Sequence, residues 1–333
     1  MRIPEGRGPV SEHVGRALAT HPDESEFLRV RLPDDIEEDI LGADLQLALW
    51  MLYEQSYRGF DDAHSHEWEP AAVGVRRRLE TTFERVLRRD TGARLEAVVA
   101  LNRDLVTRFE ALVTAFDGPS VATYLQRTAT REQVLDFLTV RSLYHLKESD
   151  PHAFVVARID GPAKVALAEL QYDEFGAGRP ENLHARLYLE ALEAAGLDPR
   201  YGAYVDRTPA TVLAVNNVMS MLGLQQRLRA ATLGHLAAFE ATSSVPCRRI
   251  AAGIERVGLP PATAHYFHEH VEADAAHEQL ALRDICGSFL EQHPDEVTEM
   301  LFGAAACLYL DARAGEEQLD MWNDALSRQE LVS

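Results

Sequence analysis

Apolar residues recur every three or four positions through most of this 333-residue chain. That spacing is the period of one face of an α-helix, whereas a half-buried strand alternates every second residue. The clearest helical segments are 45–53, 75–87, 95–116, 131–147 and 211–239. Residues 155–159 resemble a strand, but no second segment is available to pair with them. The pattern therefore predicts an all-α protein.

Clusters of Gly, Pro and polar residues divide the chain into regions. Residues 1–24 are rich in these residues, and we expect a flexible leader there. The segment Ala-Phe-Asp-Gly-Pro-Ser at 115–120 is the best internal break. We therefore expect an N-terminal helical extension over residues 25–117 and a larger helical domain over residues 118–333.

The chain is acidic, with 53 Asp and Glu against 33 Lys and Arg, a formal charge of −20. Because phosphate binding needs clustered basic residues, this charge argues against a nucleic acid or an anionic membrane surface as partner. No apolar run approaches the roughly 20 residues of a membrane-spanning helix. The N-terminus has no apolar signal segment, and the three cysteines show no C-x-x-C spacing. We expect a cytoplasmic protein with reduced thiols that acts on a small molecule.

The sharpest local motif is His270-x3-Asp274-x2-His277. On an α-helix these three positions fall within roughly 60° of one another, so two imidazoles and a carboxylate project from one stripe. Mixed nitrogen and oxygen ligands suit iron, manganese or zinc, and such a set with open positions is typical of non-haem iron. The alternative is a solvated helix face that carries incidental histidines.

Four further candidate ligands lie upstream, on segments otherwise built for burial: Glu148, Glu174, His184 and Glu240. A buried carboxylate needs a partner or a metal, or it becomes protonated, although any one of these acids could instead lie on the surface. With Asp274, the acids carry four negative charges, which two divalent cations would neutralise. Seven ligands are too many for one metal ion, so the set suggests two metals that share carboxylates, as in di-iron helical proteins.

In order and spacing, the seven candidates resemble the haem-oxygenase-like diiron oxidases, also called iron-containing redox enzymes. The similarity is greatest to the N-oxygenating domains of nitrosourea-forming enzymes. The pattern reads Glu148-x25-Glu174-x9-His184-x55-Glu240-x29-His270-x3-Asp274-x2-His277. The flanking segments 173–180 and 234–243 agree with the family, and the resemblance covers about residues 120–300, with a weaker part at 45–54.

The resemblance implies a bundle of about seven core helices that holds two iron ions, Fe(II) or Fe(III), and no haem. All seven candidates would then be metal ligands. Further implications are O2 as co-substrate, a peroxo-diferric intermediate and an external electron donor. In the N-oxygenating relatives the extension supports dimerisation, so we expect a homodimer. The resemblance favours N-oxygenation of an amine or guanidine of an amino-acid-like metabolite, in natural product biosynthesis.

Other functions fit parts of the same pattern. The same diiron scaffold could perform C–H chemistry, namely desaturation, oxidative C–C cleavage or decarboxylation of an amino or fatty acid. A non-catalytic iron-binding protein is a more remote alternative. A ferritin-like bundle repeats Glu-x-x-His on two helices, and only Glu181 with His184 matches it, which leaves Glu181 as a substitute for Glu174. A haem ligated by His145 would leave the acids unexplained.

Several remaining features have simpler explanations. Arg179 and Arg229 are candidates to bind a substrate carboxylate through a bidentate fork, although surface solvation explains either one as well. The tract His-Ser-His-Glu-Trp-Glu at 64–69 resembles a metal site but lies in a polar connection. The aromatic residues within 50–57 are expected in the core or at a subunit interface.

Overall fold

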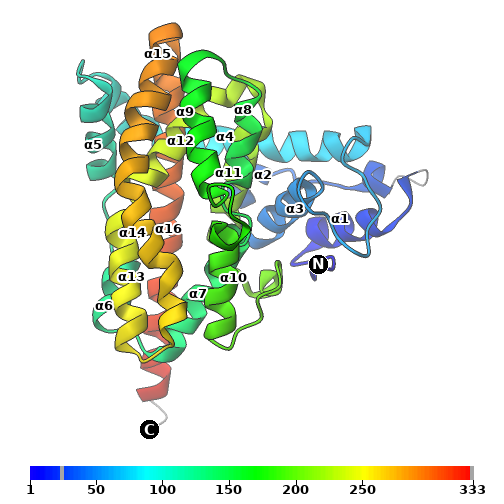
Figure 1. Ribbon diagram of the computed structural model, residues 1–333. Coiled ribbons are helices and arrows are strands. Elements are labelled where there is room, and N and C mark those ends of the chain that lie inside the picture. The colour runs from blue at the N-terminus through cyan, green and yellow to red at the C-terminus, as the bar shows by residue number, and fades with distance from the viewer. Residues whose placement is uncertain (23–25, 331–333) are drawn as a thin grey trace.

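A computed structural model describes the backbone of residues 1–22 and 26–330, and their side chains except at 272–276 and 325–330. This part of the chain is helical and contains no strand, which confirms the all-α class. Figure 1 shows a tall bundle of roughly parallel and antiparallel helices, from whose side the first helices of the chain project.

The expected flexible leader is instead helical over much of its length. Helix α1 (Pro9–Ala19) begins with proline at its first position and buries Val10 and Val14, which are four residues apart. The carboxylate of Asp44 accepts hydrogen bonds from the backbone N–H groups of Val10 and Ser11, at 3.0 and 2.6 Å. Composition was misleading here because this helix is held by a contact with a later segment.

The extension contains η2 (Glu26–Arg29), α2 (Ile36–Asp39), α3 (Ala43–Glu54), α4 (Pro70–Val99) and α5 (Leu105–Ala115). Every residue of α3 from Leu45 to Glu54 is buried, since this helix packs against α1, α4 and α11 (Ala210–Leu224). The extension and the bundle share one continuous apolar core. The aromatic residues of α3, Trp50 and Tyr53, belong to that core.

The remaining helices form the bundle. They are α6 (Val121–Arg127), α7 (Arg131–His145), α8 (Asp150–Val156), α9 (Gly161–Glu174), α10 (His184–Ala194), α11, α12 (Arg229–Ala241), α13 (Ser244–Arg256), α14 (Pro261–Gln279), α15 (Ser288–Gln292) and α16 (Val297–Glu330). Short 3-10 helices join them, namely η3 (Pro180–Asn182), η4 (Val205–Arg207), η5 (Gln226–Leu228) and η7 (Pro294–Glu296), together with the π-helix η6 (Leu280–Gly287).

Helices α12 and α16 pack in very close contact. A Cβ atom on Gly234 would lie 1.8 Å from the carbonyl oxygen of Met300, and one on Gly303 would lie 1.8 Å from that of Ala231. Only glycine permits two backbones to approach so closely. This pair of glycines therefore sets the position of α12, the helix that carries Glu240.

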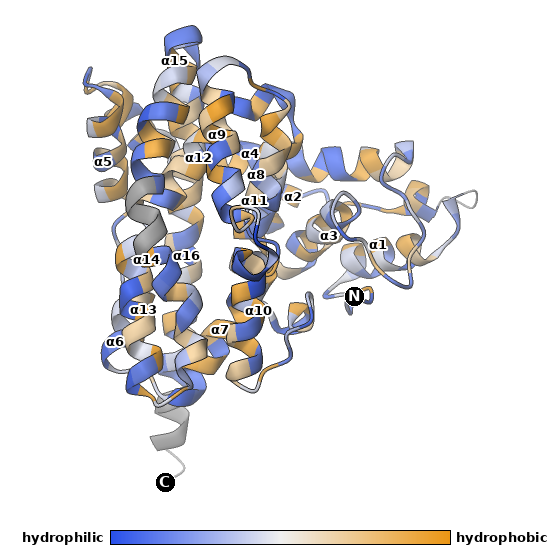
Figure 2. Ribbon diagram, in the orientation of Figure 1, coloured by the Kyte–Doolittle hydropathy of each residue, from blue (hydrophilic) through white to orange (hydrophobic). Residues whose placement is uncertain are grey.

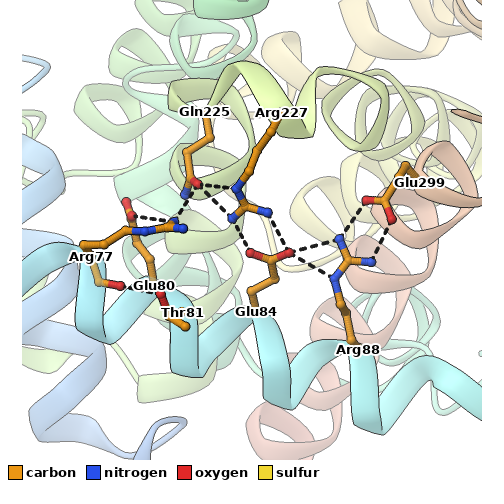
Figure 3. Close-up of polar contacts among 8 residues, drawn as sticks. All are labelled: Arg77, Glu80, Thr81, Glu84, Arg88, Gln225, Arg227 and Glu299. Atoms are coloured by element: carbon orange, nitrogen blue, oxygen red, sulfur yellow. Dashed lines mark hydrogen bonds and ion pairs between the residues drawn. The ribbon is translucent and has the colours of Figure 1, made fainter.

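The predicted single helix over 211–239 is wrong, because the chain breaks between α11 and α12. Gln225 is extended, and η5 follows it. Figure 3 shows the reason: Arg77 of α4 donates to the Gln225 side chain at 3.0 Å, and Arg227 donates to Glu84 of α4 at 2.9 Å. The spacing of apolar residues continues across residue 225, so the sequence pattern does not show the break. The contacts with α4 are visible in the tertiary structure alone.

Hydrophilic and hydrophobic residues alternate around the bundle helices (Figure 2). Among the described residues, no helix combines the length and the apolar character that crossing a bilayer requires. Cys286 and Cys307 are buried free thiols, in agreement with the absence of a C-x-x-C pattern.

Candidate metal centre

Six of the seven predicted ligands come together inside the bundle, and all six are buried. They form two groups in which one ligand atom from each residue lies within 4.8 Å of the others. The groups are Glu148, Glu174, His184 and His270, and Glu174, Glu240 and His277. The seventh candidate, Asp274, has a side chain outside the described residues.

Glu174 belongs to both groups, and its two oxygens face different partners. Its Oε2 lies 3.1 Å from Nδ1 of His184, and its Oε1 lies 3.3 Å from Nδ1 of His277. A carboxylate that offers one oxygen to each side has the geometry of a bridge between two metal ions. The distance from Nδ1 of His277 to Oε2 of Glu240 is 3.6 Å.

A sharp turn brings Glu174 and the next histidine, His184, together. Glu174 is the last residue of α9 and His184 the first of α10. Between them Gly176 has a φ of +83°, and a Cβ there would lie 2.4 Å from the carbonyl oxygen of Arg179. Because only glycine tolerates both conditions, this residue allows the chain to fold back within ten residues.

Glu148 lies in the turn between α7 and α8, and His270 on α14 faces it. Nε2 of His270 is 3.5 Å from Oε1 of Glu148. The hydroxyl of Tyr266 lies 2.8 and 2.7 Å from the two oxygens of that carboxylate, and 2.6 Å from Nδ1 of His145. Tyr266, which also contacts His145, therefore holds the Glu148 carboxylate in its orientation. Residues around metal ligands commonly play this role.

The carboxylates and imidazoles shift one another's pKa values strongly. Burial raises the pKa of Glu174, but the facing His184 and His277 outweigh it and bring the pKa well below its usual range. Burial lowers the pKa of His277, yet Glu174 and Glu240 raise it to about 11. In the metal-free site Glu174 is thus ionised and His277 carries a proton, which a bound cation would replace.

The donor set fits iron. The Nδ1 atoms of His184 and His277 are buried and make no aligned hydrogen bond, although carboxylate oxygens lie 3.1 to 3.6 Å away. Ligands that converge on a common ion have this arrangement, since each atom points at the ion and not at its neighbour. Imidazole and carboxylate together are ligands that non-haem iron prefers.

Other predicted site residues lie elsewhere. Glu181 is exposed on η3, so Glu174, and not Glu181, faces the cluster. Arg179 is exposed in the loop between α9 and α10. Arg229 forms an ion pair with Glu296 and lies eleven residues before Glu240, about 16 Å along the helix axis. Neither arginine has a contact that assigns it a substrate.

In the tract 64–69, His66 plays a packing role, whereas His64 is exposed. His66 is buried, with Nδ1 2.7 Å from Glu69 and Nε2 3.0 Å from the carbonyl oxygen of Thr20. Both ring nitrogens are therefore occupied, as the simpler explanation of this tract predicts.

Sequence reasoning missed Tyr266 and the π-helix that follows α14. Tyr266 precedes His270 by four residues, and this spacing on one helix face was an available signal. The π-helix η6 begins three residues after His277 and has no such signal in the sequence. Short π-helical segments occur frequently beside functional sites.

The helical fold and the buried cluster of Glu and His residues together define an all-α metalloprotein. Comparison with known protein families agrees with this class. The model of the iron-containing redox enzyme family matches residues 135–312, just over half of the chain. The chain belongs to this family. It is therefore an oxidoreductase that binds iron in a haem-oxygenase-like fold, which confirms the resemblance seen in the sequence.

A known relative is the nitrosourea synthase of Streptomyces achromogenes subsp. streptozoticus. The two chains are 28% identical over 152 residues, which are 46% of this chain and 32% of the relative. The chain thus matches about a third of that enzyme's length.

Proposed function

We propose that this protein is an O2-activating non-haem diiron oxygenase. The observation that carries the proposal is Glu174, whose two oxygens face two separate groups of ligand atoms. One iron would be held by Glu148, His184 and His270, and the other by Glu240 and His277, with Glu174 shared. Asp274 is proposed as the seventh ligand from its place in the motif.

The protein's own residues supply geometry, charge and exclusion of water. The four carboxylates, Asp274 included, match the charge of two ferrous ions, and the histidines then bind as neutral imidazoles. Bound iron supplies the electrons and the Lewis acidity for the reaction with O2. Burial of all six described ligands keeps bulk water from the site, and Tyr266 holds the Glu148 carboxylate in place.

For the reaction, we propose N-oxygenation of an amine or guanidine on an amino-acid-like metabolite. The similarity to an enzyme named nitrosourea synthase supports this choice. The formal charge of −20 also favours a cationic substrate over an anionic one. Turnover would draw electrons from an external donor, and the extension would support a homodimer.

The test is an anaerobic titration of the metal-free protein with Fe(II), followed by rapid mixing with O2. We expect two irons per chain, an absorption transient that depends on iron, and a product with a new N–O bond from a panel of amines and guanidines. One iron per chain, or no iron-dependent use of O2, would contradict the diiron proposal. Oxidation at carbon by the two-iron form would contradict N-oxygenation alone.

A further inference from the structure

A buried ion pair joins the extension to the turn that carries Glu148. Lys147 is 2% exposed and Glu54, the last residue of α3, is fully buried. The Lys147 ammonium forms an ion pair with Oε1 of Glu54, and the hydroxyl of Tyr201 donates to the same oxygen at 2.6 Å. The ammonium also lies 4.1 Å from the centre of the Tyr57 ring.

The turn itself has a conformation that needs support. Ser149 follows Glu148 with a φ of +68°, in the left-handed region that a residue with a side chain seldom adopts. A residue of the extension contacts the turn on both sides of Ser149. Arg58 donates to the carbonyl oxygen of Leu146 at 2.9 Å and lies 3.8 Å from the carboxylate of Asp150.

Burial of this pair is not explained by stability. Two charges lose hydration when they are buried, and apolar residues of similar volume are often as stabilising. A buried pair does, however, fix the relative positions of its two partners. Here the partners are the end of α3 and the residue directly before Glu148.

We infer that Glu54 and Lys147 are positioning residues for Glu148, so that the extension is a structural part of the metal centre. The inference rests on the proposed function, because it takes Glu148 as an iron ligand. It predicts an asymmetric defect: loss of the pair should weaken the iron held with Glu148 and spare the iron held by Glu240 and His277.

The main variant is the double substitution Glu54→Leu with Lys147→Met, which removes both charges together and leaves no unpaired buried ion. Tyr201→Phe is a milder second variant that removes one hydrogen bond to Glu54. Glu80→Gln is the matched control, since Glu80 is a buried carboxylate of the extension whose ion-pair partners, Arg76 and Arg77, lie on its own helix.

Two measurements on the full chain test the inference. Fe(II) titration of the double variant should show one iron bound roughly 10- to 100-fold more weakly and the other unchanged. Hydrogen exchange of the metal-free protein should be faster at residues 146–150. Tyr201→Phe should change both in the same direction by less, and Glu80→Gln should leave both as in the unmodified protein.

Glu148→Ala separates failure of the inference from failure of the proposed function. If this variant loses an iron while the double variant and Tyr201→Phe bind both irons normally with unchanged exchange, the positioning role is wrong and the diiron site stands. If Glu148→Ala itself keeps both irons, the ligand assignment fails and the inference fails with it.

Discussion

The two halves of the candidate metal centre are built differently. Glu148 lies in a turn directly before Ser149, which has a left-handed conformation. His184 is the first residue of a helix, and the segment before it contains Gly176 in a left-handed conformation. Glu240 and His277 lie in the last turns of α12 and α14, with regular helix before each of them, and α14 continues directly into the π-helix η6. A half that depends on irregular backbone needs added supports, whereas a half on continuous helices depends on how those helices pack.

The shared ligand should be the most sensitive position of all. Glu174→Ala is expected to abolish binding of both irons, because it removes one ligand oxygen from each half. Iron per chain, measured after anaerobic loading, checks this. Circular dichroism should show the helical content retained, and a variant that keeps one tightly bound iron would show that Glu174 does not bridge.

The half of the metal centre that contains Glu240 and His277 should be sensitive to changes in helix packing. Gly303→Ala places a Cβ 1.8 Å from the carbonyl oxygen of Ala231, so α12 and α16 must separate. We expect a loss of about 3 kcal/mol in the free energy of unfolding, measured with urea. Gly74→Ala on α4, where a Cβ meets nothing within 4 Å, is the control and should not destabilise the protein. Equal effects of the two changes would refute the close-packing argument.

The half of the metal centre that contains Glu148 should bind iron more weakly when a supporting hydrogen bond is removed. Tyr266→Phe removes the hydroxyl that contacts Glu148, and we expect roughly 10- to 100-fold weaker binding of one iron. Tyr188→Phe is the control, since Tyr188 packs 4.8 Å from the Tyr266 ring but donates to the carbonyl oxygen of Leu138. Unchanged titration curves for Tyr266→Phe would show that Glu148 needs no such support.

A smaller effect of pH should come from two buried histidines near the metal centre. His152, one turn after Glu148, and His235 on α12 are buried, with ring nitrogens 3.3 Å apart. Burial lowers the pKa of His152 to about 4. The unfolded chain, with an ordinary histidine pKa, therefore binds more protons than the folded chain between about pH 6.5 and 4.

Stability from neutral His152 is thus present above pH 6.5 and lost as the pH falls toward 4. We expect the metal-free protein to lose about 1 to 2 kcal/mol between pH 7 and pH 5 from this group, measured by urea unfolding at each pH. His152→Gln should reduce that dependence, and the part that remains is expected from His235, whose pKa burial also lowers. His265→Gln, at an exposed histidine beside Glu269, should leave it in place. A dependence of undiminished size in His152→Gln would show that His152 does not contribute to it.

Sequence reasoning reached the class of fold and the order of the candidate ligands. Helical period is a local property, so segments such as 131–147 could be recognised without knowing their neighbours. The helix-borne motif from His270 to His277 was visible for the same reason. The leader at 1–24 and the single helix at 211–239 were misjudged, because Asp44 in the first case and Glu84 with Arg77 in the second act from distant parts of the chain.

The amino-acid sequence by itself determined an all-α chain with acids and histidines at spacings typical of an iron enzyme. Only the tertiary structure decided that Glu174 faces both groups of ligands, that Tyr266 contacts Glu148, and that Glu54 pairs with Lys147. These relations join residues as far apart as 93 and 118 positions. Spacing along one helix can be read from the chain, but contacts between helices depend on how the whole bundle packs.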